Sequence, residues 1–253
     1  MTAAIHTLGC KVNRCDAESL ALNLTGYGFK FCDFGETADV YIINTCTVTH
    51  VSDKKSMQLI RRAKRRNPDA IIAVCGCLAK RDLPDGFAAD IVFDARKPEE
   101  FIKKLGKFTG LTFQSDKCKQ TAPTKRTRSF VKIQDGCEQF CAYCIVPYVR
   151  GPSASRKKSE VINEINNLIN NGAKEIVLTG IHVSSYNDEG GFTSLLKKVL
   201  SLDGLYRLRL SSIDPMAIND DFLEIAGGYD NLCPFFHLSL QSGSDEVLKK
   251  MNR

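Results

Sequence analysis

The sequence contains no apolar run long enough to cross a membrane, since runs such as Ile176–Leu178 have only the length of a β-strand. The first ten residues carry neither the basic region nor the apolar stretch of a secretory signal peptide. There is also no internal repeat and no low-complexity tract. We therefore expect a cytoplasmic protein without membrane contact. Apolar residues make up 43% of the 253 residues, which is enough for real cores, and this length is compatible with two domains.

The lack of a signal peptide also governs how the cysteines are interpreted. The chain has 11 cysteines, an odd number, and a disulfide framework is not expected in a reducing cytosol. Metal ligation fits that compartment better. The formal net charge of +6 is modest, so it permits an anionic partner without establishing one.

The first part of the sequence alternates between short apolar runs and helix-like stretches. This pattern predicts an α/β domain with a mostly parallel sheet over residues 1–108. The expected strands are 3–8, 40–45, 70–74 and 90–93, and the expected helices are 16–27, 51–66 and 98–105. Residues 109–128 are polar and basic and include Pro123, as expected of a linker.

A second alternation follows and predicts part of a TIM-like (β/α) barrel over residues 129–253. The expected strands are 130–134, 175–179, 207–211 and 235–240, and the expected helices are 159–171, 193–200, 220–226 and 244–251. The loops after the strands form the working face of such a barrel. Four strands do not close it, so we expect the barrel to be incomplete in this chain.

Three cysteines with the spacing C-x3-C-x2-C come directly after the first strand of the second domain, at Cys137, Cys141 and Cys144. Three thiolates can hold three irons of a cubane cluster and leave the fourth iron open. A structural zinc site would need a fourth Cys or His at finger spacing, and a haem-attachment motif would need His where Ile145 stands. The spacing, with Tyr143 before the last cysteine, resembles the radical S-adenosylmethionine (SAM) superfamily. In that superfamily the open iron binds SAM, which is cleaved to a radical.

A second cysteine set is dispersed in the first domain, where Cys10, Cys46 and Cys77 each follow an expected strand. The loops after parallel strands converge on one edge, so these thiols are expected to meet there. Three buried structural thiols are the alternative interpretation. Cys75 competes with Cys77 as the third ligand, and Cys15 on the first expected helix could also approach the site.

The sequences around these cysteines resemble the three N-terminal motifs of the methylthiotransferase family. They are 7–13 (TLGCKVN), 44–49 (NTCTVT) and 76–79 (GCLA), and further similar motifs lie at 145–147, 150–151, 155–156, 178–186 and 237–244. The resemblance implies a second [4Fe–4S] cluster held by Cys10, Cys46 and Cys77. It also implies a tRNA substrate, an electron donor such as flavodoxin or ferredoxin, and a C-terminal RNA-binding domain that this chain lacks.

Weaker signals concern SAM and RNA. By position and resemblance, Tyr143, Gly180 and Gln241 are candidate cofactor contacts, although 179–181 (TGI) departs from the commoner Gly-Gly-Glu of the superfamily. The expected helix 51–66 carries seven basic residues between Lys54 and Arg66 and no acidic one there. A second basic patch comprises Lys117, Lys119, Lys125, Arg126 and Arg128. Such runs are usually solvated faces, but together with the family they favour RNA binding.

The motifs most resemble the subgroup that methylthiolates C2 of threonylcarbamoyladenosine beside the tRNA anticodon. The resemblance implies two stages, methylation of sulfur at the N-terminal cluster and radical activation of the adenine C2 at the other cluster. One alternative is another methylthiotransferase substrate, either isopentenyladenosine in tRNA or a ribosomal protein. A metal-stabilised RNA-binding module without catalysis is the alternative from a different functional class.

Overall fold

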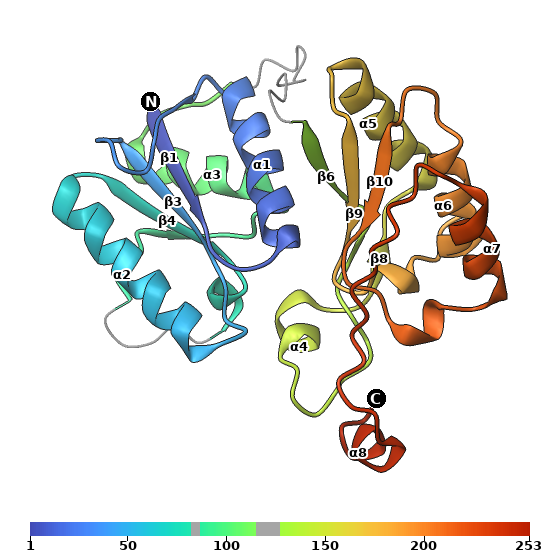
Figure 1. The fold of residues 1–253 in the computed structure, drawn as a ribbon. Coiled ribbons are helices and arrows are strands. Elements are labelled where there is room, and N and C mark those ends of the chain that lie inside the picture. Colours follow the sequence, from blue (N-terminus) through green and yellow to red (C-terminus); the bar gives the residue numbers. More distant parts are fainter. Residues whose placement is uncertain (82–86, 115–126) are drawn as a thin grey trace. The chain divides into compact units, whose positions relative to one another are not determined.

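The computed structural model describes residues 1–81, 87–114 and 127–253. The chain divides into two compact units, Met1–Ala122 and Pro123–Arg253. Figure 1 shows a sheet flanked by helices in each unit, so the predicted α/β class is confirmed. None of the helices in the described ranges is both long enough and apolar enough to span a membrane.

The first unit is built on a five-stranded parallel sheet with the order β2-β1-β3-β4-β5. Its strands are β1 (Thr2–Thr7), β2 (Lys30–Phe31), β3 (Val40–Thr45), β4 (Ile71–Gly76) and β5 (Ile91–Val92). In this order the direction of winding reverses between β1 and β3. Doubly wound sheets bind their ligands at such a switch point, outside the carboxyl ends of the strands.

Alternate residues of the central strands face opposite layers of helices. Val40 and Ile42 of β3 pack in one core with α1 (Lys11–Gly26) and α3 (Pro98–Thr109). Tyr41 and Ile43 pack in another core with α2 (His50–Arg66). All six residues of β3 are buried, as expected for a strand covered on both faces. Each large apolar side chain buried in this way contributes about 1.5–3 kcal/mol.

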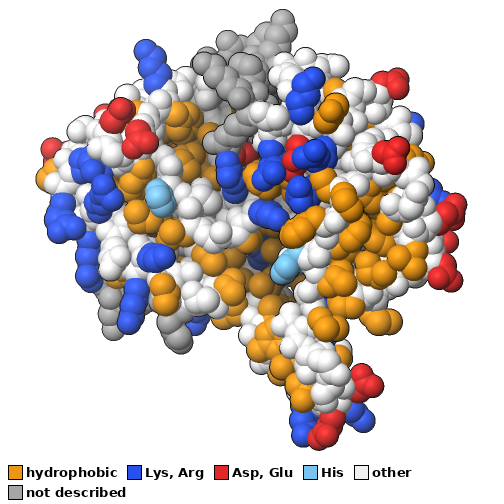
Figure 2. All heavy atoms as spheres, viewed as in Figure 1, with side chains coloured by type: hydrophobic (Ala, Val, Ile, Leu, Met, Phe, Trp, Pro, Cys, Tyr) orange, Lys and Arg blue, Asp and Glu red, His pale blue; other side chains and the backbone are white. Residues whose placement is uncertain are grey.

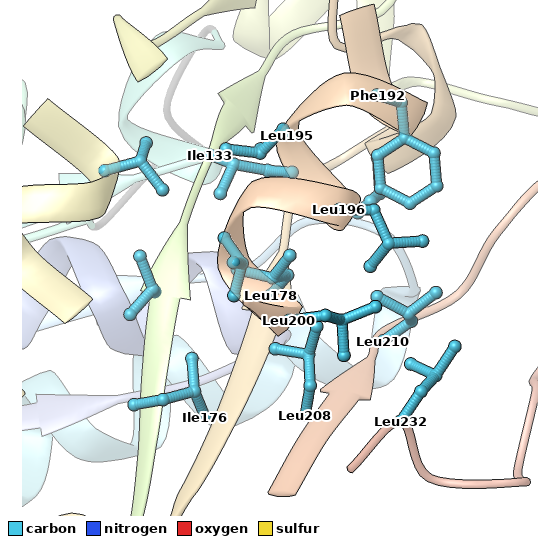
Figure 3. Packing of buried hydrophobic residues seen from close by; sticks show 14 of the residues in the cluster. Ile133, Ile176, Leu178, Phe192, Leu195, Leu196, Leu200, Leu208, Leu210 and Leu232 are labelled. Atoms are coloured by element: carbon cyan, nitrogen blue, oxygen red, sulfur yellow. The ribbon is translucent and has the colours of Figure 1, made fainter. Parts of the chain in front are cut away.

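The second unit contains a three-stranded parallel sheet with the order β10-β9-β6. The strands are β6 (Arg128–Lys132), β9 (Glu175–Thr179) and β10 (Arg207–Leu210), and the main helices are α5 (Lys158–Asn170), α6 (Gly191–Leu200) and α7 (Asp220–Gly228). Ile176 and Leu178 of β9 share one core with Leu195 and Leu196 of α6 (Figure 3). This core holds the sheet against its helices and leaves the strand ends free to carry loops.

Shorter elements occupy those loops. They are η1 (Leu78–Lys80), η2 (Val183–Ser185), η3 (Pro215–Ala217), α4 (Val146–Arg150), α8 (Asp245–Lys250) and the antiparallel pair β7 (Gln134–Asp135) and β8 (Ala154–Ser155). The helix α1 begins at Lys11, directly after Cys10, rather than at residue 16 as expected. At the ends of the expected linker 109–128, α3 runs to Thr109 and β6 begins at Arg128.

The expected strand at residues 235–240 is wrong. That segment has one isolated bridge, between Ile213 and Leu238, and forms no regular strand. Phe235 and Leu240 are 57% and 54% exposed. A strand is stabilised by continuous pairing and by burial of alternate side chains, and this segment has little of either.

Candidate functional site

The three N-terminal candidate ligands lie at the carboxyl edge of the first sheet. The strand register pairs Thr7 with Asn44 and Thr45 with Gly76, so β1, β3 and β4 end side by side. Cys46 and Cys77 directly follow β3 and β4, and Cys10 follows β1 at the N-cap of α1. The backbone N–H of Cys77 donates to the carbonyl oxygen of Thr45 at 3.1 Å. The structure therefore brings the three cysteine loops together at the switch point of the sheet.

Gly9 lets the Cys10 loop approach Cys46 closely. Its φ is +99°, and a Cβ at this position would lie 2.9 Å from the Cys46 Sγ. Any larger residue would therefore be strained and would push against the thiol. Cys46 and Cys77 are each 5% exposed, whereas Cys10 is exposed. Cys10 stands at the N-cap of α1, and its side chain makes no capping hydrogen bond to the first turn of that helix.

Cys75 lies in a different environment from Cys77. It is fully buried in the core between the sheet and the helices α1 and α3. Burial raises the pKa of the Cys75 thiol well above its ordinary value, and the charges of Asp16 and Asp94 add to that rise. Iron ligation requires a thiolate, so this position is unfavourable for a ligand. Cys15 is half-buried on α1.

Among the described residues, no three Cys, His, Asp or Glu side chains are gathered tightly enough to hold a single metal ion. This arrangement does not show a mononuclear site in that part of the chain. It is compatible with a cubane cluster, because each thiolate of such a cluster binds a different iron and the sulfur atoms stand further apart than the ligands of one ion.

The C-x3-C-x2-C loop is anchored at both ends in the second unit. The backbone N–H of Cys137 donates to the carbonyl oxygen of Gly151 at 3.1 Å, and that of Cys144 donates to Cys141 at 2.9 Å. Gly136 has a φ of +72°, and a Cβ there would lie 2.6 Å from the Gly151 oxygen. Cys141 is buried, while Cys137 and Cys144 are half-buried. Burial raises the pKa of the Cys137 thiol, although an N–H from Gln139 opposes that rise.

Gln134 ties this loop to the end of β9. Its side chain is completely buried, and its Nε2 donates to the carbonyl oxygens of Asp135 and Gly136 at 2.9 and 2.7 Å. Its Oε1 accepts from the backbone N–H of His182 at 2.8 Å. A Cβ at Gly180 would lie 3.0 Å from this Oε1. The predicted cofactor contact Gly180 thus allows Gln134 to reach across the strand ends.

A buried ion pair between Arg150 and Asp135 also stabilises the cysteine loop. The Arg150 Nη1 lies 2.8 Å from the Asp135 Oδ1, and the Lys132 Nζ lies 3.2 Å from the Asp135 Oδ2. Burial works to raise the pKa of Asp135, but the charges of Arg150 and Lys132 outweigh it and hold this pKa below its ordinary value. The carboxylate is therefore ionised at neutral pH.

The other two predicted cofactor contacts are exposed. Tyr143 is 52% exposed, and desolvation, followed by the charge of Cys141, raises its pKa. Gln241 is exposed with a φ of +66° and lies outside any regular element. Phe140, also on the cysteine loop, packs edge-on against Tyr148 with ring centroids 5.6 Å apart.

The segment Met251–Arg253 also holds the cysteine loop, which the sequence did not indicate. The Met251 carbonyl accepts from the Ala142 N–H at 2.9 Å, and the Arg253 Nη1 lies 3.9 Å from the Cys141 Sγ. The Arg253 Nη2 pairs with the Asp214 Oδ2 at 2.6 Å. These contacts span up to 112 residues of sequence, so no local pattern could have revealed them.

Comparison with known proteins identifies both parts of the chain. Residues 2–94 match the uncharacterized protein family UPF0004, and residues 131–253 match the Radical SAM superfamily. The chain is 40% identical over 271 residues to a threonylcarbamoyladenosine tRNA methylthiotransferase, MtaB, of Bacillus subtilis (strain 168). It is 33% identical over 261 residues to a tRNA-2-methylthio-N(6)-dimethylallyladenosine synthase of Endomicrobium trichonymphae. The chain belongs to the radical SAM methylthiotransferase family.

Both relatives are longer than this member of the methylthiotransferase family. The alignments cover 100% of the chain but 60% and 62% of the two relatives. Among solved structures, the chain resembles the cobalamin-dependent radical SAM enzyme OxsB, with a TM-score of 0.66, 11% identity and coverage of 99% of this chain and 45% of OxsB. It also resembles the methyltransferase TsrM of Kitasatospora setae, with a TM-score of 0.64, 12% identity and coverage of 98% and 60%. These structural likenesses show the fold alone.

For the radical SAM part of the chain, the superfamily implies a [4Fe–4S] cluster and SAM. The donor set fits that group, because three thiols lie in one loop whose start packs closely, through Gly136, against the Gly151 backbone. Cys137, Cys141 and Cys144 are the residues that would hold the cluster. The N-terminal set fits a second cluster on different grounds, because three loops at one sheet edge bring its thiols together and Gly9 lets the Cys10 loop lie against Cys46.

Proposed function

We propose that this chain carries the catalytic parts of an enzyme that methylthiolates C2 of threonylcarbamoyladenosine beside the anticodon of tRNA. The proposal assigns one [4Fe–4S] cluster to each cysteine set. Cys137, Cys141 and Cys144 hold the cluster that works with SAM, and Cys10, Cys46 and Cys77 hold the second cluster. The single electron for the reaction would come from a small redox protein such as flavodoxin or ferredoxin.

The observation that carries the proposal is the second cysteine set. A radical SAM enzyme that only abstracts hydrogen needs one cluster, whereas insertion of sulfur needs a source of sulfur as well. Cys46 and Cys77 leave adjacent parallel strands and Cys10 caps the helix beside them. This arrangement supports a second sulfur-rich centre at the place where doubly wound sheets bind ligands.

When bound, the SAM–cluster pair supplies a radical strong enough to abstract hydrogen from an unactivated C–H bond. The protein's part is to hold the loop and restrict its motion. Gln134 and the Asp135–Arg150 pair fix the two ends of the loop beneath the cysteines. Asp214 lies 2.6 Å from Arg253 and 3.9 Å from the His182 Nε2, so it joins the ends of β9 and β10 to the cysteine loop.

Threonylcarbamoyladenosine is favoured as the substrate over isopentenyladenosine. Relatives named for the former are 34–40% identical to this chain, and relatives named for the latter are 33–36% identical, so the two ranges overlap. The choice therefore rests on the motifs 9–13 (GCKVN) and 178–182 (LTGIH), with the 40% identical relative in support.

A basic face on α2 supports tRNA as the partner. Five of its cations are exposed and form no ion pair among the described residues, namely Lys54, Lys55, Arg61, Arg62 and Arg65. Figure 2 shows the basic side chains gathered over this part of the first unit. Lys64 and Arg66 differ, because Lys64 pairs with Asp90 at 3.2 Å and Arg66 donates to the Phe34 carbonyl at 2.7 Å. We propose that the five exposed residues contact RNA phosphates.

The second basic patch gives less support to tRNA as the partner. Lys117, Lys119, Lys125 and Arg126 lie outside the described residues. Arg128 is paired with Glu175 at 2.6 Å, and Arg209 reaches the same carboxylate at 3.0 Å. Arg128 is therefore engaged within the protein.

The experiment that tests the function is mass analysis of tRNA nucleosides. The full-length gene is expressed in cells that lack their own methylthiotransferase for threonylcarbamoyladenosine. We expect that nucleoside to gain one methylthio group and isopentenyladenosine to remain unchanged. A gain on isopentenyladenosine would move the enzyme to the other branch. No modified nucleoside together with no bound iron would favour the RNA-binding module without catalysis.

A further inference from the structure

The side chain of Asn13 lies at the centre of the N-terminal cysteine edge. Asn13 is in the first turn of α1 and is completely buried. Its Nδ2 donates to the carbonyl oxygens of Leu8 and Thr45, both at 2.9 Å. Its Oδ1 lies 4.0 Å from the Cys77 Sγ, within reach of a weak hydrogen bond from the thiol. One amide group therefore contacts three segments that are far apart in sequence.

Each of these contacts belongs to a different cysteine loop. Leu8 lies two residues before Cys10, Thr45 directly precedes Cys46, and the third contact is with Cys77 itself. A Cβ at Gly9 would lie 3.1 Å from the Asn13 Nδ2, so the amide also lies against the backbone that leads into Cys10. The three loops share this single buried contact point.

A second amide holds Asn13 in place. The Asn44 Nδ2 donates to the Asn13 carbonyl oxygen at 2.7 Å, and Asn44 is 1% exposed. Asn44 is the register partner of Cys75 on β4, so this contact links α1 to the middle of the sheet. Asn13 is thus fixed on its backbone side as well as through its side chain.

The chemistry at this position requires a primary amide. A neutral NH₂ group has two donors, and both are needed to satisfy two buried carbonyl oxygens. An aspartate of the same shape has no donor and would place negative charge against those oxygens and beside the cysteine thiolates. A shorter side chain could not reach both carbonyl oxygens, so the link between the Leu8 and Thr45 segments would be lost, although Thr45 would keep the Cys77 N–H.

We propose that Asn13 is the positioning residue of the N-terminal cluster, fixing the spacing of the Cys10, Cys46 and Cys77 loops. The inference rests on the proposed two-cluster function. Outer-shell partners of metal ligands commonly change metal affinity by about 10- to 100-fold when they are mutated. The loss of Asn13 should therefore weaken iron retention at this set without removing any ligand.

The test uses a full-length protein in which Cys137, Cys141 and Cys144 are replaced by Ala, so that bound iron reports on the N-terminal set alone. Into this parent we introduce Asn13→Asp and Asn13→Ser. The matched control is Asn23→Ala on the same helix, because within the described ranges the Asn23 amide bonds to the Ser19 carbonyl of its own helix and to no other residue. After anaerobic reconstitution, three properties are measured: the rate of iron loss to a chelator, the electron paramagnetic resonance spectrum of the reduced cluster, and its midpoint potential.

We expect iron loss to be at least about tenfold faster in Asn13→Asp, with an altered spectrum and potential. Asn13→Ser keeps one donor and should show a smaller change, and Asn23→Ala should match the parent. If Asn13→Asp does not fold, Asn13→Ser decides the question through its spectrum and potential, which a merely structural role would leave unchanged. Parent-like spectrum, potential and retention in the Asn13 variants would overturn this inference alone. No iron in the parent would overturn the two-cluster function and this inference together.

Discussion

At the scale of single residues, two neighbouring cysteines of one strand end lie in different environments. Cys75 is the last core residue of β4, and Cys77 lies past Gly76 at the sheet edge. Side chains alternate along a strand, so Cys75 and Cys77 would share a face if the strand continued. Gly76, with a φ of +89°, ends the strand and lets the chain turn at Cys77.

This difference predicts opposite results for two substitutions. Cys77→Ala should lose about four irons per chain, because the N-terminal cluster loses a ligand. Cys75→Ala should keep its iron and lower the free energy of unfolding by about 1 kcal/mol, since it removes a buried sulfur from the core. Iron analysis and urea unfolding check both. Iron loss confined to Cys75→Ala would move the ligand to that position.

The Asp135–Arg150 pair predicts a pH effect on stability. The folded-state pKa of Asp135 lies below its ordinary value of 3.8, so its contribution is present above the unfolded pKa and is lost as the pH falls through the folded pKa. Asp135→Asn leaves Arg150 buried without its charged partner and should cost about 3–5 kcal/mol near pH 7. The difference between the two proteins in unfolding free energy should shrink from pH 5 towards about pH 2. A constant difference over that range would contradict this account of the pair.

The sequence indicates candidate cluster ligands but not the residues that hold them in place. The cysteines were found from spacing and from their position after apolar runs. Asn13 and Gln134 were missed as contact residues because their partners come from distant parts of the sequence. Thr45 is 32 residues from Asn13, and His182 is 48 residues from Gln134. A side chain whose role depends on tertiary contacts leaves no periodic signal in the sequence.

At the scale of elements, buried strands were predicted best. The strands β3 and β9 were expected over the residues they occupy, because all their side chains are buried and their apolar runs are continuous. The two-residue strand β2 was missed because both of its residues are exposed. The expected strand at 235–240 is wrong for a related reason, since an apolar run is not a strand without a partner.

The turn at Gly76 gives a prediction at this scale. A Cβ at Gly76 would lie 2.7 Å from the Thr45 N, whereas Gly172 has a similar φ of +93° and open space around it. Gly76→Ala should therefore destabilise the protein by more than Gly172→Ala, which carries the cost of the φ angle alone, about 1 kcal/mol. Gly76→Ala should also release N-terminal iron. Equal unfolding free energies in the two variants would contradict the close packing at this turn.

At the scale of the whole molecule, the basic face of α2 predicts a salt-dependent contribution to RNA binding. The slope of log affinity against log salt is negative. Replacing Arg61, Arg62 and Arg65 with Gln should reduce its magnitude by roughly 0.7–0.9 per lost phosphate contact. The control replaces the exposed Lys103, Lys107 and Lys198 with Gln, which removes the same charge elsewhere. The measurement uses an unmodified anticodon stem-loop RNA. Equal slopes in both variants would show that net charge, and not the α2 face, accounts for binding.

The central feature of the molecule is that each unit carries its own set of three cysteines at the ends of parallel strands. One set is contiguous and one is dispersed, and a closely packed glycine precedes a cysteine of each set, Gly9 before Cys10 and Gly136 before Cys137. Because the two sets lie on two compact units, the two proposed clusters can be tested one at a time.

Iron and acid-labile sulfide content tests this claim most directly. It is measured after anaerobic reconstitution in the unmodified protein and in two triple variants, Cys10/Cys46/Cys77→Ala and Cys137/Cys141/Cys144→Ala. We expect about eight irons in the unmodified protein, from two clusters of four, and about four in each triple variant. About four irons in the unmodified protein, with no loss on removal of the N-terminal cysteines, would contradict the two-cluster account.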